Sequence, residues 1–248
     1  MNPITGLPLK INILHIPFRS KGIELKPQVK GIKDKFVSNP LFDEFGNKKY
    51  IEEAIANNPR IISILNKHSL PITINLEELE KLKQGHLNDT RVVAAKIYSS
   101  LPDELKKEVD LTSLQKAALL HDFGKVLIPN SILNKPGKLT PDERKIMDLH
   151  SELSYELLKN KDLDKKTLNL IKYHHQNIKG DGYPAIEKDF DYNIEAQILT
   201  TADKYTALRE KRSYKNPIAK YEALEIIAKD VNKGNISQDI YTALLKSV

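Results

Sequence analysis

A histidine and an aspartate stand next to each other at His121 and Asp122, where the apolar run 117–120 ends, and a glycine and a lysine follow at Gly124 and Lys125. Burying such polar groups beside leucines is unfavourable unless something compensates them. A divalent metal ion compensates an imidazole and a carboxylate well. The doublet therefore predicts a metal site, and further ligands must come from elsewhere, because two residues do not hold a hydrolytic ion with useful affinity.

Later segments of the chain supply more histidines and a second aspartate. His150 ends an apolar-faced segment, the pair His174 and His175 ends another, and Asp203 follows the apolar residues 198–199. A carboxylate has two oxygens, so Asp122 could bridge two ions. One arrangement places these residues around two ions, with His121, Asp122 and Asp203 at the first and Asp122, His150, His174 and His175 at the second.

The elements that must position these ligands have the pattern of helices. Helical periodicity and helix start signals predict helices over 77–84, 87–99, 103–108, 113–122, 141–158, 165–176, 194–210, 217–231 and 237–247. Residues 112–115 resemble a capping box, and Thr140 with Pro141 combines an N-cap with a first-turn proline. Metal sites in bundles use inward-facing side chains from several helices, so ligands far apart in sequence are expected.

The first part of the chain has a different pattern. Runs rich in β-branched residues at 9–14 and 61–65 are interrupted by Asn-Pro pairs at 39–40 and 58–59. This pattern predicts a small mixed α/β region over residues 1–75. We therefore expect a mainly α protein, with this N-terminal region preceding a helical domain over 76–248.

The composition excludes several functional classes. The 248 residues include no cysteine, so thiol catalysis is excluded and any metal must be held by His, Asp or Glu. No apolar stretch reaches the ~18 residues that span a bilayer, and the beginning of the chain lacks a signal peptide pattern. The formal net charge is +6, but the lysines are scattered among glutamates. We expect a cytoplasmic protein that binds neither membranes nor nucleic acids in general.

The candidate ligands and the motifs between them resemble the HD-GYP branch of the HD-domain metal-dependent phosphohydrolases. The resemblance covers roughly residues 76–230, and its segments are 121–125, 128–129, 132–140, 150, 174–175, 182–184, 202–205 and 212–215. It implies an all-α HD-domain bundle and a di- or trinuclear iron or manganese centre. It also implies hydrolysis of cyclic di-GMP to pGpG, to GMP or to both.

Two positions near the histidine pair depart from the family pattern. The family usually has His-His-Glu followed by Asp-Gly-x-Gly-Tyr-Pro, whereas this chain has Gln176 for the glutamate and Lys179 for the aspartate. Neither residue is a predicted metal ligand. The hydrogen bonds that orient the imidazoles are therefore expected to differ, while the metal site is retained.

The early histidine ligand is also displaced. In the family it usually lies three residues before an Arg-Val pair, and this position is Asn88 here. His86 lies two residues earlier, about 200° around a helix, and Asp89 is a second substitute. The glutamate expected four residues before the early histidine, for a third ion, is Gln84 here. We therefore expect two divalent ions, with His86 as the candidate ligand.

The remaining motif residues are suited to binding a phosphodiester. Two ions would acidify a bridging water toward hydroxide and clamp the phosphoryl oxygens. Lys125 would contact the reacting phosphate and contribute to catalysis with Asp122, and Arg212 and Lys215 would bind the other phosphate. Tyr183 would stack on a guanine or present its hydroxyl.

Two rival functions remain open at this point. One is another HD-type nucleotide phosphohydrolase, and the other is a degenerate cyclic-dinucleotide receptor or docking module without turnover. The expected partners are cyclic di-GMP, a signalling protein at the Gly-Tyr-Pro surface, and a second copy of the chain in a homodimer.

Overall fold

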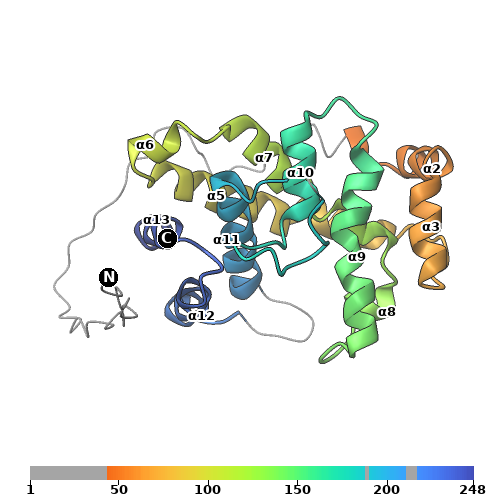
Figure 1. Cartoon of the computed structure of the whole chain (residues 1–248). Coiled ribbons are helices and arrows are strands. Elements are labelled where there is room, and N and C mark those ends of the chain that lie inside the picture. The colour runs from red at the N-terminus through yellow and green to blue at the C-terminus, as the bar shows by residue number, and fades with distance from the viewer. Residues whose placement is uncertain (1–43, 188–189, 211–216) are drawn as a thin grey trace, which may run out of the picture. The chain divides into compact units, whose positions relative to one another are not determined.

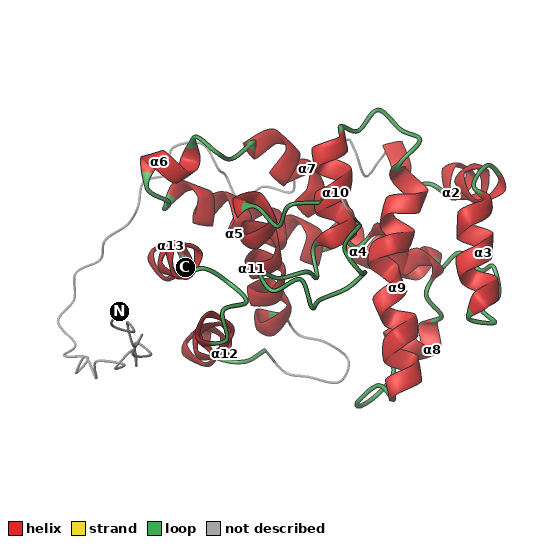
Figure 2. Ribbon diagram, in the orientation of Figure 1, coloured by secondary structure: helices red, strands yellow, loops and turns green. Residues whose placement is uncertain are grey.

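The computed structural model describes residues 44–187, 190–210 and 217–248. These residues fall within one compact unit, 38–248. Within these ranges the regular elements are all helical, as Figure 1 and Figure 2 show. The expected mainly α fold is therefore confirmed.

The elements follow one another along the chain with short connections. They are α2 (Lys48–Ala56), α3 (Pro59–Lys67), α4 (Leu76–Gln84), α5 (His86–Ser99), α6 (Asp103–Lys106), α7 (Leu111–Leu120), the 3-10 helix η1 (Phe123–Leu127), α8 (Asn130–Leu133), α9 (Pro141–Leu158), α10 (Lys165–Tyr173), α11 (Ile194–Arg209), α12 (Lys220–Asn232) and α13 (Gln238–Ser247).

The centre of the bundle is formed by α5, α7, α9, α10 and α11. Helix α7 packs against both α5 and α10, α11 packs against α5, and η1 packs against α9. Large apolar side chains from these helices are completely or almost completely buried, among them Leu87, Ile97, Leu114, Leu120 and Leu153. Each such side chain stabilises the fold by about 1.5–3 kcal/mol. The same packing brings the candidate ligands together, because they lie on or next to these helices.

Two helix starts show how local signals set the boundaries. Thr140 and Glu143 form the reciprocal hydrogen bonds of a capping box, and Pro141 occupies the first turn of α9. The predicted start of α9 is confirmed. Helix α7 instead begins two residues before the predicted position, because the carboxylate of Asp110 accepts hydrogen bonds from the backbone N–H groups of Thr112 and Ser113. The capping box predicted at 112–115 is wrong for this reason.

The β-branched run 61–65 belongs to α3, so the prediction of a strand-containing region is wrong for these residues. The side chain of Asn58 accepts a hydrogen bond from Arg60 N at 3.1 Å, and Pro59 occupies the first turn. The Asn-Pro pair therefore starts a helix. The buried residues of α3 also have helical spacing, at Ile61, Ile64 and Leu65.

Helices α2 and α3 pack against α9 and share the core of the bundle. The Tyr50 hydroxyl donates to the Leu157 carbonyl at 2.7 Å, and Asn58 Nδ2 donates to the Glu156 carboxylate at 2.8 Å. A separate N-terminal region over 1–75 stays a prediction for residues 1–43, which lie outside the described residues together with the 9–14 run. No helix in the described ranges has the length and apolar character required to cross a membrane.

Candidate metal centre

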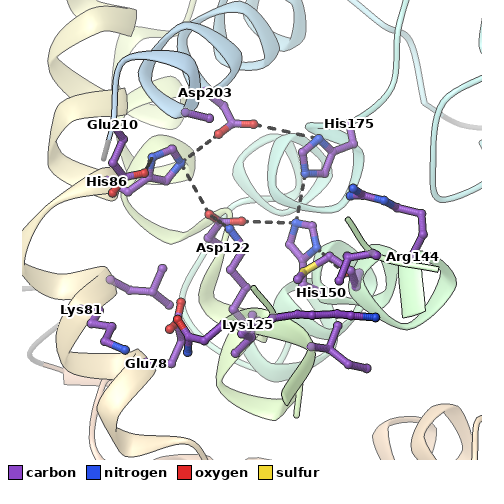
Figure 3. A pocket seen from close by; sticks show the side chains of 18 of the residues that line it. Glu78, Lys81, His86, Asp122, Lys125, Arg144, His150, His175, Asp203 and Glu210 are labelled. Carbon is purple, nitrogen blue, oxygen red and sulfur yellow. Dashed lines mark hydrogen bonds and ion pairs between the residues drawn. The ribbon is translucent and has the colours of Figure 1, made fainter. Parts of the chain in front are cut away.

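The histidines and aspartates predicted as ligands meet at one buried place (Figure 3). Their ligand atoms form two groups, and within each group these atoms lie within 4.8 Å of one another. Group 1 consists of Asp122, His150, His174 and His175, and group 2 consists of His86, His121 and Asp203. The structure thus brings together every residue that the sequence singled out as a metal ligand.

Asp122 lies between the two groups and directs one carboxylate oxygen toward each. Its Oδ1 lies 3.2 Å from His150 Nε2 in group 1. Its Oδ2 lies 3.5 Å from His121 Nε2 and 3.6 Å from His86 Nε2 in group 2. A carboxylate in this position can serve both groups, as the sequence arrangement requires of a bridge.

Three of the imidazoles are oriented by the helices that carry them. His121, His150 and His174 each place Nδ1 within hydrogen-bond distance of the carbonyl three residues earlier, at 3.0, 2.6 and 2.7 Å. A carbonyl only accepts, so the ring proton lies on Nδ1 and the lone pair lies on Nε2. All three Nε2 atoms are therefore acceptors directed toward the interior of the site.

The spacing of these acceptors fits a cation. His150 Nε2 lies 3.2 Å from His174 Nε2 and 3.1 Å from His175 Nε2. With the protons of His150 and His174 on Nδ1, the first pair brings two lone pairs together without a proton between them. His121 Nε2 is buried and has no hydrogen-bond partner among the described residues. Divalent ions would satisfy these nitrogens, so the donor set fits a metal centre.

Burial and neighbouring charges favour ligand-competent forms in group 1. Burial, assisted by His175, lowers the pKa of His174 well below its usual range. Burial, assisted by His150, lowers the pKa of His175 to about 3. Burial alone would raise the pKa of Asp122, but Lys125 and His121 hold it well below its usual range. Unprotonated imidazoles and an ionised carboxylate are the forms that bind metals.

Group 2 has a different charge balance. Burial would lower the pKa of His86, but its contacts with Asp203 and Glu210 raise it to about 9. Burial would raise the pKa of Asp203, whereas hydrogen bonds with His121 and His86 hold it well below its usual range. In the absence of an ion, carboxylates therefore stabilise a positive charge at this end of the site.

Of the three candidates for the early ligand, His86 is the one that lies in the cluster. It is buried at the first turn of α5, and its Nε2 lies 2.9 Å from Asp203 Oδ1. Asn88 accepts hydrogen bonds from the Arg91 side chain, and Asp89 is exposed. Helix α5 begins directly after Gly85, and this start places His86 at the site.

The turn after the His-Asp doublet packs closely against α9. A Cβ atom at Gly124 would lie 2.2 Å from the His150 carbonyl oxygen and 2.5 Å from Ser154 N. The glycine is thus needed for close backbone approach. Gly124 N donates to Ser154 Oγ at 2.7 Å, and this hydroxyl lies within hydrogen-bond distance of the carbonyls of His121 and His150, at 2.7 and 2.8 Å. Ser154 therefore connects ligand segments of both groups.

A cavity of about 900 Å³ opens onto the two groups. It is lined by His86, Asp122, Lys125, His150, His175 and Tyr183, among other residues. Lys125 Nζ donates to Asp122 Oδ2 at 2.5 Å, which places an ammonium group beside the predicted bridge. This volume lies within the range of about 300–1,000 Å³ that is typical of small-molecule sites. The predicted phosphate contacts Arg212 and Lys215 lie outside the described residues.

The Gly-Tyr-Pro turn is held beside the histidine pair. The Tyr183 ring lies 4.6 Å from the His175 ring, centroid to centroid, and lines the cavity. Gln176 Oε1 accepts from Gly182 N at 3.1 Å, and its Nε2 donates to the Pro184 carbonyl at 2.5 Å. An ionised glutamate could not make the second bond. The departure at Gln176 thus changes how the turn is fixed, while the predicted ligands still converge.

Sequence reasoning missed Glu210, which contacts the site from the residue after α11. Its Oε2 lies 3.4 Å from His86 Nδ1. Glu210 follows Asp203 by seven residues, the spacing that returns to the same helix face after two turns. That spacing was the available signal, but it becomes informative only once Asp203 is known to face inward.

A family model described as "HD domain" matches residues 53–239. The chain belongs to the HD domain family. The recognition of its HD-GYP branch is confirmed as well. A solved structure described as an HDG"Y"P protein, from Bdellovibrio bacteriovorus, aligns with a TM-score of 0.54 at 19% identity, over 84% of this chain and 67% of that one. At this identity the match supports the HD fold alone.

Several curated phosphodiesterases resemble this HD-domain chain. A cyclic di-GMP phosphodiesterase of Thermotoga maritima is 36% identical over 56% of this chain and 38% of its own length. A cyclic di-GMP phosphodiesterase response regulator of Xanthomonas campestris is 40% identical over 44% and 29%. A 3'3'-cGAMP-specific phosphodiesterase of Vibrio cholerae is 31% identical over 57% and 30%. The chain spans about a third of the length of these relatives.

Proposed function

We propose that this HD-domain chain is a metal-dependent phosphodiesterase that hydrolyses cyclic di-GMP to pGpG, to GMP or to both. The observation that carries the proposal is the position of Asp122 between two groups of ligand atoms, at a cavity of about 900 Å³. The names of the relatives support a cyclic dinucleotide as the substrate class.

The proposed cofactor is a pair of divalent ions, iron or manganese. His150, His174 and His175 would hold one ion, His86, His121 and Asp203 would hold the other, and Asp122 would contact both. Imidazole and carboxylate ligands without thiolates suit both metals. When bound, the ions would supply an activated water and would neutralise charge on the phosphoryl oxygens.

The protein residues would bind and orient the reacting phosphate. Hydrolysis adds a water oxygen to phosphorus, breaks the bond from phosphorus to the ribose oxygen, and delivers a proton to that leaving oxygen. Lys125 is positioned to hold positive charge at the cavity floor, and its hydrogen bond to Asp122 orients the shared carboxylate. Tyr183 would close the cavity beside His175, since its ring packs against that imidazole.

The decisive experiment is reconstitution of the protein with Fe(II) or Mn(II), followed by measurement of cyclic di-GMP hydrolysis. His121→Ala and Asp122→Ala serve as controls that remove predicted ligands, and guanosine tetraphosphate serves as the substrate of the rival HD-type reaction. We expect turnover of cyclic di-GMP alone, with loss in both variants. Tight binding without turnover under every metal condition would instead identify a receptor.

Three further parts of the hypothesis stay predictions. Arg212 and Lys215 are proposed to bind the second phosphate. A signalling protein is proposed to bind at the Gly-Tyr-Pro surface, and the chain is proposed to form a homodimer. Mixing the chain with candidate partners in analytical ultracentrifugation would test the last two.

A further inference from the structure

An arginine and an aspartate one helical turn apart stand at the wall of the cavity formed by α9. Arg144 and Met147 line the cavity together with His150, so one side of α9 faces it. Figure 3 shows the Arg144 side chain directed toward the side of the cavity where His150 and His175 lie. Neither Arg144 nor Asp148 belongs to the proposed metal ligands or to the phosphate contacts.

These two side chains are only loosely committed to each other. Arg144 Nη1 lies 4.0 Å from Asp148 Oδ1, and the exposed fractions of the two side chains are 60% and 25%. A pair this long and exposed contributes little to stability. Asp148 Oδ1 has no hydrogen-bond partner within the described part of the chain. The guanidinium and the carboxylate both retain capacity for a ligand.

Tyr183 contributes to the placement of the carboxylate. A hydrogen bond with Tyr183 and the charge of Arg144 act to lower the pKa of Asp148, against burial, which raises it. The Tyr183 ring in turn packs against His175. Asp148 is thus held between the Gly-Tyr-Pro turn and Arg144, at the cavity but separate from the two ligand groups.

The chemistry of this pair suits a nucleobase better than a phosphate. A phosphate beside Arg144 would also lie near the carboxylate of Asp148, which repels it. A neutral ligand with acceptors and donors on adjacent atoms would satisfy both groups. Guanine offers O6 and N7 to an arginine fork, and its N1–H and N2 amino group to a carboxylate. Adenine places an amino donor where guanine has O6, so it cannot match the fork in this way.

We propose that Arg144 and Asp148 are specificity-determining residues that recognise one guanine of the cyclic dinucleotide. The inference rests on the proposed function for the class of substrate, and it adds which base the cavity selects. Because a single guanine suffices, 3'3'-cGAMP would also bind with its guanine at this position, whereas cyclic di-AMP would gain nothing from the pair.

The test compares cyclic di-GMP, 3'3'-cGAMP and cyclic di-AMP against the full chain and three variants. Arg144→Gln and Asp148→Asn remove the charges, and Lys145→Gln is the matched control, since Lys145 is the next residue of α9, is exposed and pairs with Asp142 outside the cavity lining. Dissociation constants are measured by calorimetry in a chelator, which prevents turnover. The ratio of kcat/KM values is measured with Mn(II).

For Arg144→Gln we expect the dissociation constants of cyclic di-GMP and 3'3'-cGAMP to rise about 10-fold or more, because a bidentate guanine contact discriminates by that order. The constant for cyclic di-AMP should stay unchanged. Asp148→Asn should shift the same two ligands in the same direction, and Lys145→Gln should shift none. Thermal unfolding of each variant checks that the fold is retained.

The outcomes separate this inference from the proposed function. Equal loss for all three ligands in Arg144→Gln would indicate a phosphate contact and overturn the guanine assignment, while hydrolysis could still stand. A guanine preference that depends on Arg144, without turnover, would support the assignment and overturn the enzymatic proposal. A wild-type chain that binds none of the three ligands, with or without Mn(II), would overturn both.

Discussion

Group 1 and group 2 reach the same cavity by different structural means. In group 1, the imidazoles of His150 and His174 are fixed by the carbonyls of their own helices, and burial keeps His174 and His175 unprotonated. In group 2, His86 stands at the start of α5 and is oriented by Asp203 and Glu210. Group 1 is thus positioned mainly by backbone, whereas group 2 depends on contacts between side chains from different helices.

The largest effect should come from the residue that joins the two groups. Asp122→Ala removes an oxygen ligand from each group, so both ions should be lost and kcat/KM should fall by more than the ~10–100-fold typical of residues behind the ligands. Elemental analysis and turnover measure the two effects. Retention of two ions in this variant would contradict the bridging role and with it the connection between the groups.

The groups can be distinguished by removing one histidine from each. We expect His174→Ala to empty group 1 and His86→Ala to empty group 2, so that each variant retains about one ion per chain. Metal content by mass spectrometry, with circular dichroism as the control for folding, gives the result. Two ions retained in His86→Ala would show that His86 contacts the site without binding metal.

Ser154 tests how tightly the groups are connected. Ser154→Ala leaves Gly124 N and the nearby carbonyls without their hydroxyl partner, so we expect a loss of about 1–3 kcal/mol in the free energy of unfolding. Ser99→Ala is the matched control, because Ser99 donates to a single carbonyl in α5, away from the doublet. Equal losses in urea titrations of the two variants would contradict the connecting role of Ser154.

The smallest effect should come from the cap that starts the helix before His174. Asp164 accepts from Thr167 N at 2.7 Å, and Asp164→Ala should cost about 1 kcal/mol at pH 7 while both ions are retained. Burial would raise the pKa of Asp164, but its hydrogen bonds, the first with Thr167, lower it overall. The stabilisation is therefore present above the pKa of the unfolded state and lost as the pH falls through the folded value. Unfolding curves at pH 7 and near pH 3 should converge for the two proteins.

Local patterns predicted much of this protein because helices leave local marks. The start of α9 at Thr140 and Pro141 was predictable from capping chemistry, and the ligands at 121–122, 150, 174–175 and 203 were predictable from motif order. The same local reasoning failed at 61–65, where β-branched residues suggested strand. There the Asn58 cap and burial against α9 decided for helix.

The sequence by itself determined which residues could bind metal, their order along the chain and the helical class of the fold. Only the tertiary structure decided that His86, rather than Asn88 or Asp89, enters group 2, that the two oxygens of Asp122 face different groups, and that Arg144 and Asp148 face the same cavity. The physical reason is that periodicity fixes which side chains share a helix face, whereas the partner of that face depends on how the helices pack.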